Sequence, residues 1–245
     1  MKERNLKNYY LGKSNVIAYS FLLTTIVLPG RLVNPLYIYG DSGVGKTHLM
    51  RAVQHAYNYL IPTKRAVYIT ARELCDELVK SILNGEACKM VENIYREADI
   101  LMIDDLQYIA DKNATQVEMS QVFLELCDRN RQVILACDRP LKEFPALYAR
   151  MYARFGELRE VELHIPDRKL RRKLIRKKVK AMGLTISDET AAYILENAFI
   201  SPQIDGLLNE LELRRKMNGR CSKHGEENHT SGHTHKAQNS ASHFK

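Results

Sequence analysis

One octapeptide constrains this chain more than any other feature. Residues 40–47 read Gly-Asp-Ser-Gly-Val-Gly-Lys-Thr, which matches the phosphate-loop pattern G-x-x-x-x-G-K-[ST]. An apolar run, 36–39, leads into it, and the segment 47–59 with helical apolar spacing follows it. Glycines let backbone N–H groups turn toward phosphate oxygens, and the start of a helix adds its positive dipole end. We therefore expect a nucleoside triphosphate site here rather than a glycine-rich turn without a ligand.

The residues of this loop are candidate ligands for ATP and its metal ion. Lys46 is expected to reach the β and γ phosphates, and the Thr47 hydroxyl is expected to bind Mg²⁺. The other candidates for nucleotide binding are Gly40, Asp41, Ser42, Gly43, Val44, Gly45 and His48.

A pair of carboxylates follows the apolar run 100–103. An acid at the carboxyl end of a buried parallel strand lies at the edge of the sheet where ligands bind. We expect Asp104 to hold Mg²⁺ through water and Asp105 to polarise the attacking water. An Asp-rich turn after a strand is the alternative, and the phosphate loop upstream makes it the weaker interpretation.

Four continuous apolar runs alternate with helical segments in the first two thirds of the chain. The runs are 36–39, 66–69, 100–103 and 133–136, and the helical segments between them are 47–59, 71–83 and 117–127. Continuous runs are typical of strands covered on both faces, so the pattern predicts an α/β fold with a parallel sheet.

After Pro166 the pattern changes to helices alone. Helical spacing covers 168–182, 187–197 and 203–217, and from residue 219 almost nothing is apolar. We predict a nucleotide-binding core over 1–165, a small all-helical lid over 166–218 and a disordered tail over 219–245. The tail carries His229, His233 and His235, whose spacing gives only a weak hint of metal binding.

Charge and composition narrow the class of protein. The 245 residues include 37 Lys plus Arg against 29 Asp plus Glu, a net charge of +8 that favours phosphate-bearing partners. No apolar run reaches the ~18 residues that span a bilayer. The first residues also lack the apolar core of a signal peptide, so we expect a cytoplasmic protein.

Several segments resemble, in order and spacing, the AAA+ module of the DnaA family of bacterial chromosomal replication initiators. They are 12–15, 34–40, 45–50, 101–110, 138–140 with 142–143, and 150–155, within a likeness that runs from about residue 8 to residue 218. The resemblance implies a P-loop AAA+ ATPase that binds ATP and Mg²⁺. It implies slow hydrolysis, ATP-dependent assembly and a role in initiating or regulating chromosomal replication.

The resemblance assigns roles to matching positions. Asp138 is similar to the sensor that touches the γ phosphate, although an Asp that caps a turn is the alternative. Arg154 is similar to the arginine finger that reaches the ATP of a neighbouring subunit, against the alternative of an ordinary surface arginine. Asn15 is carried over as a residue near the adenine. The implied partner across Arg154 is a second copy of the chain or a full-length DnaA.

The resemblance also implies contacts with single-stranded DNA. The length of 71–98 fits a family insertion used for that contact, and Val79 and Lys80 match its pattern. A later family stretch usually supplies two basic residues, of which Lys112 is kept while Ala114 replaces the second. Losing a phosphate contact weakens binding. For the basic segment 167–180, a solvated helix face is favoured over contact with DNA and over membrane lipid.

Two departures from the family pattern change the expectation. Pro202 stands where the lid normally offers an arginine to the nucleotide, so closing of the lid and hydrolysis are in question. The sequence ends at Lys245 without a helix-turn-helix pattern, so duplex origin recognition is not expected from this chain alone. Two alternatives follow: a regulatory adaptor that docks on full-length DnaA, and a helicase-loader ATPase, which the insertion over 71–98 disfavours.

Overall fold

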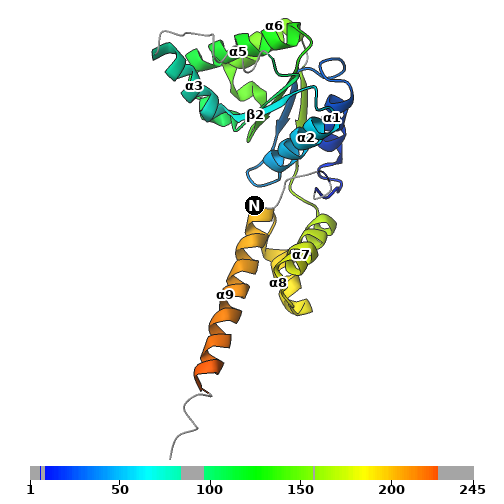
Figure 1. The fold of residues 1–245 in the computed structure, drawn as a ribbon, viewed down its shortest axis with the longest axis vertical. Coiled ribbons are helices and arrows are strands. Elements are labelled where there is room, and N and C mark those ends of the chain that lie inside the picture. Colours follow the sequence, from blue (N-terminus) through cyan, green and yellow to red (C-terminus); the bar gives the residue numbers. More distant parts are fainter. Residues whose placement is uncertain (1–5, 7–8, 84–96, 157, 226–245) are drawn as a thin grey trace, which may run out of the picture.

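The computed structural model describes residue 6 and residues 9–83, 97–156 and 158–225. They form an α/β core and a smaller group of helices, α7–α9, which we call the lid (Figure 1). The predicted α/β class is therefore confirmed. In chain order the elements are α1 Val16–Val27, β1 Leu36–Tyr39, α2 Lys46–Leu60, β2 Ala66–Thr70, α3 Ala71–Leu83, β3 Ile100–Asp104, η2 Leu106–Ile109, α5 Asn113–Asp128, β4 Gln132–Cys137, η3 Leu141–Glu143, α6 Pro145–Phe155, β5 Arg159–Glu162, α7 Arg168–Met182, α8 Asp188–Asn197 and α9 Ser201–Gly225.

The core sheet has five parallel strands in the order β2-β3-β4-β1-β5. Strand β4 lies between β1 and β3, in a register that pairs Leu135 with Tyr37 on one side and with Ile103 on the other. The segments that follow these three strands therefore leave the sheet side by side. They are the phosphate loop after β1, the two carboxylates after β3 and Asp138 after β4.

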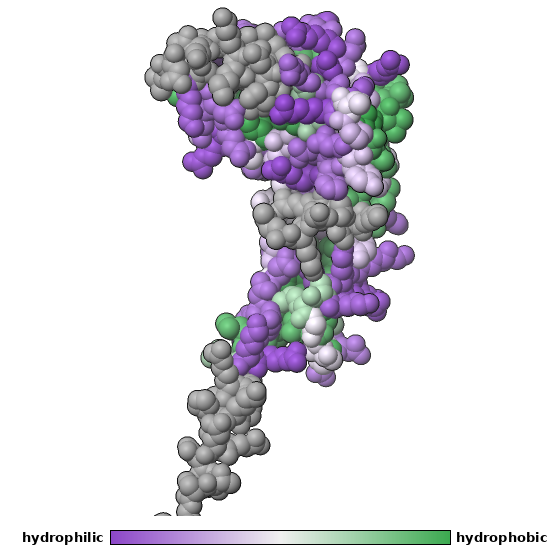
Figure 2. Space-filling model, in the orientation of Figure 1, coloured by the Kyte–Doolittle hydropathy of each residue, from purple (hydrophilic) through white to green (hydrophobic). Residues whose placement is uncertain are grey.

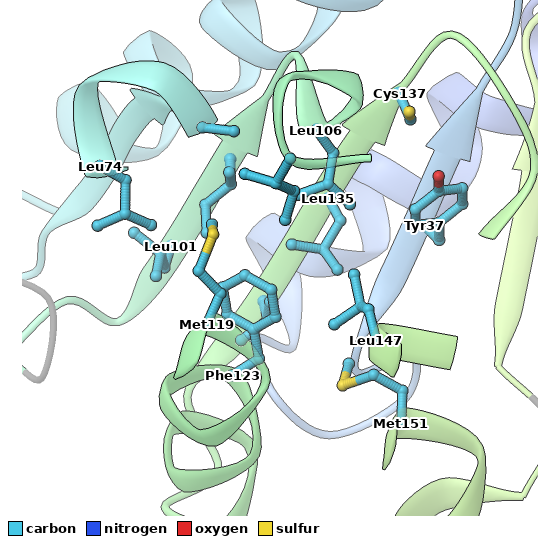
Figure 3. Close-up of a cluster of buried hydrophobic side chains, with 14 of the residues drawn as sticks. Tyr37, Leu74, Leu101, Leu106, Met119, Phe123, Leu135, Cys137, Leu147 and Met151 are labelled. Atoms are coloured by element: carbon cyan, nitrogen blue, oxygen red, sulfur yellow. The ribbon is translucent and has the colours of Figure 1, made fainter. Parts of the chain in front are cut away.

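The two faces of the sheet bury separate apolar clusters. Side chains alternate between the faces along each strand, so Leu36 and Ile38 lie in one cluster and Tyr37 in the other. Helices α1 and α2 cover the first face, whereas α3, α5 and α6 cover the second. Figure 3 shows Met119 and Phe123 of α5 beneath the strands of that second face. Covering on both faces explains why the strands read as continuous apolar runs.

The lid has a small core of its own. Ile175 of α7, Ile194 of α8 and Leu208 of α9 meet in it, all almost fully buried. Two helix starts are capped by side chains: Asp167 accepts the N–H of Leu170 at 2.8 Å, and Ser187 accepts that of Thr190 at 3.2 Å. These caps satisfy amides that the first helical turn leaves without partners.

Several contacts join the lid to the core. Asp167 also accepts the backbone N–H of Lys13 from the core at 3.2 Å, so the cap of α7 is tied to the loop before α1. Ile200, just before α9, packs against the cluster beneath α1 and α2. In the space-filling view the lid shows an apolar patch bordered by hydrophilic side chains (Figure 2). Hydrophilic side chains also predominate on the visible surface of the α/β core.

Several elements differ from the sequence-based expectation. Helix α1 and strand β5 were not predicted. Strand β5 buries only Val161, between charged and exposed neighbours, so it has no apolar run. Helix α9 continues to Gly225, seven residues into the segment predicted as a tail from residue 219. The ion pairs Glu210–Arg214 and Glu212–Lys216 stabilise the polar part of this helix, which needs no apolar face.

The described residues contain no helix long and apolar enough to cross a bilayer. They also contain no cluster of three or more side chains suited to a metal ion. The histidines of the predicted tail, His229, His233 and His235, lie outside the described residues.

Candidate nucleotide site

The phosphate loop turns on glycines whose backbone angles other residues adopt with difficulty. Gly43 has φ +81° and Gly45 has φ +114°, both in the left-handed range. Helix α2 begins directly after them at Lys46. The Lys46 side chain is buried, and its Nζ donates to the carbonyls of Gly40 at 2.6 Å and Asp41 at 3.0 Å. The loop is therefore already folded around its lysine.

Three hydrogen bonds hold the Asp104 carboxylate, which is completely buried at the end of β3. Its Oδ2 accepts the Thr47 hydroxyl at 2.6 Å and the Tyr68 hydroxyl at 2.7 Å. Its Oδ1 accepts the backbone N–H of Asp105 at 2.9 Å. Burial, together with the negative charge of Asp104, raises the pKa of Tyr68, so this hydroxyl remains a donor. The guanidinium of Arg51 lies 3.5 Å from the centre of the Tyr68 ring.

The other two predicted catalytic acids lie at the same edge of the sheet. Asp105 has φ +56°, which is uncommon outside glycine, and its carboxylate accepts the Gln107 side-chain amide at 3.1 Å. Asp138 follows β4 and accepts the Arg139 guanidinium at 2.8 Å. This hydrogen bond holds the pKa of Asp138 below its usual range, although burial opposes the shift.

A hollow of about 380 Å³ lies between these acids, the phosphate loop and the lid. Its walls are Ser42, Gly43, Gly45, Lys46, Thr47, His48, Asp105, Gln107, Asp138, Ser201, Pro202 and Asp205. Among these described residues the lid supplies Ser201, Pro202 and Asp205, so it brings a carboxylate and no cation to the cavity. Asp205 is itself paired with Lys178 of α7.

The residues present fit a nucleotide with a divalent cation. The Thr47 hydroxyl lines the cavity and donates to the buried Asp104 carboxylate behind it, and oxygen ligands are those Mg²⁺ prefers. Gly43 allows the lid to approach the loop closely, since a β-carbon there would lie 2.7 Å from Ile200 Cδ1. The start of α2 supplies the N-terminal dipole that favours phosphate.

Asn15 lies just before α1 and outside this cavity. It is 7% exposed, its amide donates to the Tyr10 carbonyl at 2.9 Å, and its Oδ1 accepts the Gly12 N–H at 2.9 Å. The Tyr9 ring packs edge-on against His48, with 5.4 Å between ring centres. His48 lines the cavity, whereas Asn15 does not and instead shapes the loop before α1.

Arg154 lies apart from this cavity, near the end of α6. Its guanidinium donates to Asp128 of α5 at 2.6 Å, and both side chains are half exposed. An exposed ion pair of this kind contributes little to stability, roughly 0–1 kcal/mol. Arg154 is thus free to exchange its partner at low cost.

The three residues predicted to contact single-stranded DNA are all exposed. Val79 and Lys80 lie on α3, and the Val79 side chain is 55% exposed. Lys112 precedes α5, with its Nζ 3.6 Å from the centre of the Tyr108 ring. Arg72 of α3 approaches the same ring at 5.3 Å. Residues 84–96 of the insertion predicted over 71–98 lie outside the described residues.

Sequence reasoning missed Tyr68, Gln107 and the lid residues Ser201 and Asp205. Tyr68 carries no motif, and its only signal is a hydroxyl within an apolar strand. Strand β2 is adjacent to β3, with Thr70 opposite Asp104, which brings Tyr68 near the carboxylate. That neighbourhood follows from the strand order, which a sequence pattern does not contain.

Comparison with known proteins gives a consistent result. The family model described as the bacterial DnaA ATPase domain matches residues 1–160. The chromosomal replication initiator protein DnaA of Symbiobacterium thermophilum is 36% identical over 191 residues, 78% of this chain and 42% of that protein. That of Caldanaerobacter subterraneus is 36% identical over 204 residues, covering 83% and 44%. The chain spans less than half the length of these curated relatives.

Solved structures show the same similarity. Domain III of the Thermotoga maritima replication initiation protein DnaA matches with a TM-score of 0.80 and 28% identity, over 89% of this chain and 91% of that one. A replication initiator DnaA bound to AMPPCP and single-stranded DNA matches with a TM-score of 0.77 and 30% identity, over 89% and 69%. The DnaC helicase loader, at 17% identity and a TM-score of 0.51, shares the fold alone.

Proposed function

The chain belongs to the family of bacterial DnaA ATPase domains, and from this premise we propose that it binds ATP with Mg²⁺ as a switch for assembly in chromosomal replication. Slow hydrolysis resets the switch. One observation carries the proposal: Lys46, Thr47 and Asp138 line one cavity beside adjacent strand ends, and Thr47 is hydrogen-bonded to the buried Asp104 at the end of β3.

The residues of the cavity divide the work of phosphate binding and hydrolysis. Lys46 would exchange its two carbonyl partners for phosphate oxygens, while the Thr47 hydroxyl would bind the cation and Asp104 would hold it through water. When bound, Mg²⁺ neutralises charge on the phosphates. Asp105, oriented by Gln107, accepts a hydrogen bond from the attacking water. Asp138 senses the terminal phosphate from the end of β4.

Assembly is proposed to depend on Arg154. The side chain is exposed and held only by a surface ion pair with Asp128, so a neighbouring site can compete for it. An arginine inserted beside the phosphates of a neighbour stabilises charge there and couples association to ATP. A second copy of this chain, or a full-length DnaA, is the proposed neighbour.

Light scattering tests this switch. With Mg²⁺ and ATP the mass of the wild-type particle should increase above that of the monomer, while with ADP it should remain monomeric. Arg154→Ala should abolish the increase. Arg168→Ala is the matched control, because Arg168 also forms an exposed ion pair, with Glu196 at 2.6 Å. A monomer under every condition, despite measurable ATP binding, contradicts self-assembly. If Arg154→Ala and Arg168→Ala abolish the increase in mass equally, the role of Arg154 is contradicted.

Binding of single-stranded DNA is a further part of the proposal. The exposed Val79 and Lys80 of α3 and the Lys112–Tyr108 pair support it, since stacked aromatic rings and cations are typical of such surfaces. A fluorescent oligothymidylate should bind in the presence of ATP, and a Lys80→Ala/Lys112→Ala variant should bind it more weakly. Equal affinity of the variant and the wild type contradicts this assignment.

A regulatory adaptor is the second candidate, and the lid supports it. Pro202 and Asp205 present no cation to the phosphates, so the lid has little to gain from closing on ATP. Such a chain would act by docking on a full-length DnaA. Immobilised protein should then retain purified full-length DnaA and change its ATPase rate. Retention of the replicative helicase instead favours a helicase loader.

A further inference from the structure

A second hollow lies at the other end of the sheet, where the strands begin. It measures about 480 Å³ and collects residues that precede four different strands. Its walls are Val27, Leu28, Pro29, Arg31, Lys64, Asp99, Arg129, Asn130 and Arg131. None of them takes part in the nucleotide site, so we call this the basal hollow.

Positive charge predominates in the basal hollow. Four of its lining residues are Arg or Lys and one is an acid, Asp99. That acid is already engaged: Arg131 pairs with it, and its Oδ2 accepts the Arg65 N–H at 3.0 Å. Arg31 and Lys64 are exposed, and within the described part of the chain neither has an ion-pair partner. The walls therefore present an uncompensated positive charge.

The loops that carry these cations are locked in place. Gly30 has φ +75°, and a β-carbon there would lie 2.0 Å from the Asn130 carbonyl oxygen, so the two loops are in close contact. The Gly30 N–H donates to the Gln132 side chain at 3.0 Å, and the Asn34 amide donates to the Arg131 carbonyl at 2.7 Å. Because like charges repel, cations held together by a rigid frame favour a bound anion.

A buried hydroxyl adjoins the same charges. Tyr57 is completely buried, and its hydroxyl has no hydrogen-bond partner among the described residues. Burial, reinforced by the Asp99 carboxylate and opposed by Arg131, raises the pKa of Tyr57 to about 12. The hydroxyl therefore stays protonated as a donor and interacts electrostatically with Asp99 and Arg131, two lining residues of the basal hollow. A buried polar group without a partner is uncommon and calls for an explanation such as a ligand or water.

We propose that the basal hollow binds a compact anion with several phosphate groups, of the class of inorganic oligophosphates. Arginine guanidinium groups match phosphate oxygens with paired N–H donors, and the basal hollow gathers three arginines and a lysine around about 480 Å³. This site is independent of the ATP site.

Calorimetric titration with tripolyphosphate tests the proposal. The background is Lys46→Ala, because the phosphate loop is a competing phosphate site. An Arg31→Ala/Lys64→Ala pair in this background should weaken binding at least about tenfold, since each hydrogen bond to a charged group is worth roughly a factor of ten. The control is Lys142→Ala/Arg214→Ala, which removes the same two residue types from exposed positions elsewhere. Circular dichroism checks that all variants fold.

The outcomes separate the possibilities. Loss of binding in the Arg31/Lys64 pair with normal binding in the control supports the site. No heat of binding at millimolar tripolyphosphate, or equal affinity in both pairs, overturns it. A third outcome also overturns the proposal and favours nucleic acid: binding of an oligothymidylate depends on Arg31 and Lys64, whereas binding of tripolyphosphate does not. Failure of ATP binding in the otherwise unchanged chain would refute the proposed function and leave this inference intact.

Discussion

Changing Tyr68 to Phe removes one oxygen atom from the network that holds the buried Asp104 carboxylate. The Tyr68 hydroxyl donates to Asp104 at 2.7 Å, and the ring that remains still lies under Arg51. A hydrogen bond to a charged group contributes about 1.5–3 kcal/mol. Asp104 keeps its bonds from Thr47 and Asp105, so the lower end of that range applies.

Two effects should follow from Tyr68→Phe. A destabilisation of about 1.5 kcal/mol lowers the Tm by about 3–6 °C for a chain of this size. Loss of a group that orients a metal ligand also weakens metal binding, typically 10–100-fold. Thermal unfolding without nucleotide measures the first effect. Titration of a fluorescent ATP analogue at rising Mg²⁺ measures the second, and binding in EDTA should be unchanged.

The control for this experiment is Tyr39→Phe. The Tyr39 hydroxyl reaches Glu162 at 3.4 Å on an exposed face, so its loss should change neither the Tm nor the Mg²⁺ dependence. If Tyr68→Phe requires no more Mg²⁺ than the wild type does, Tyr68 does not position Asp104 and the reasoning is refuted.

Three further variants test the fold. Phe123→Ala empties a completely buried position beneath the sheet and should lower the free energy of unfolding by about 3–5 kcal/mol in urea; a loss below about 1 kcal/mol contradicts the packing. Asp167→Ala removes the cap of α7 and should lower stability by about 1 kcal/mol. Asp167→Ala should also raise the rate of amide hydrogen exchange at Lys13. Ser187→Ala, which removes the cap of α8, should leave that rate unchanged. The pKa of Asp138 is depressed by Arg139, so its stabilisation is present above the ordinary Asp value of about 4 and is lost as the pH falls through the lower folded-state pKa. Asp138→Asn should therefore lose less stability than the wild type on acidification below about pH 4; an identical loss contradicts the pairing.

Sequence patterns predicted the phosphate loop, four strands and the acids after β3 because each leaves a local mark. Apolar runs mark strands buried on both faces, and glycines mark a loop that turns through positive φ. Strand β5 left no such mark, since one buried valine among charged residues suffices at an edge where β1 provides the pairing. Helix α1 is apolar on nearly all sides, with Ile17 and Val27 exposed, so helical periodicity was missing.

The sequence predicted the motif residues of the candidate site but not the side chains that form hydrogen bonds with them. Lys46, Thr47 and Asp104 follow from spacing, whereas Tyr68 reaches Asp104 only because β2 lies beside β3. The basal hollow was equally hidden. Its cations belong to turns more than 30 residues apart in sequence, and only the parallel sheet brings the starts of its strands together.

The lid meets the phosphate loop through carbon atoms. Ile200 and Pro202 face Gly43, where a β-carbon would lie 2.7 Å from Ile200 Cδ1 and 3.3 Å from Pro202 Cδ. Apolar contacts are insensitive to the ionic screening that weakens charge pairs, and they lose strength on cooling. An arginine in place of Pro202 would make this contact depend on salt. As the chain stands, this contact at Gly43 should weaken on cooling rather than on addition of salt.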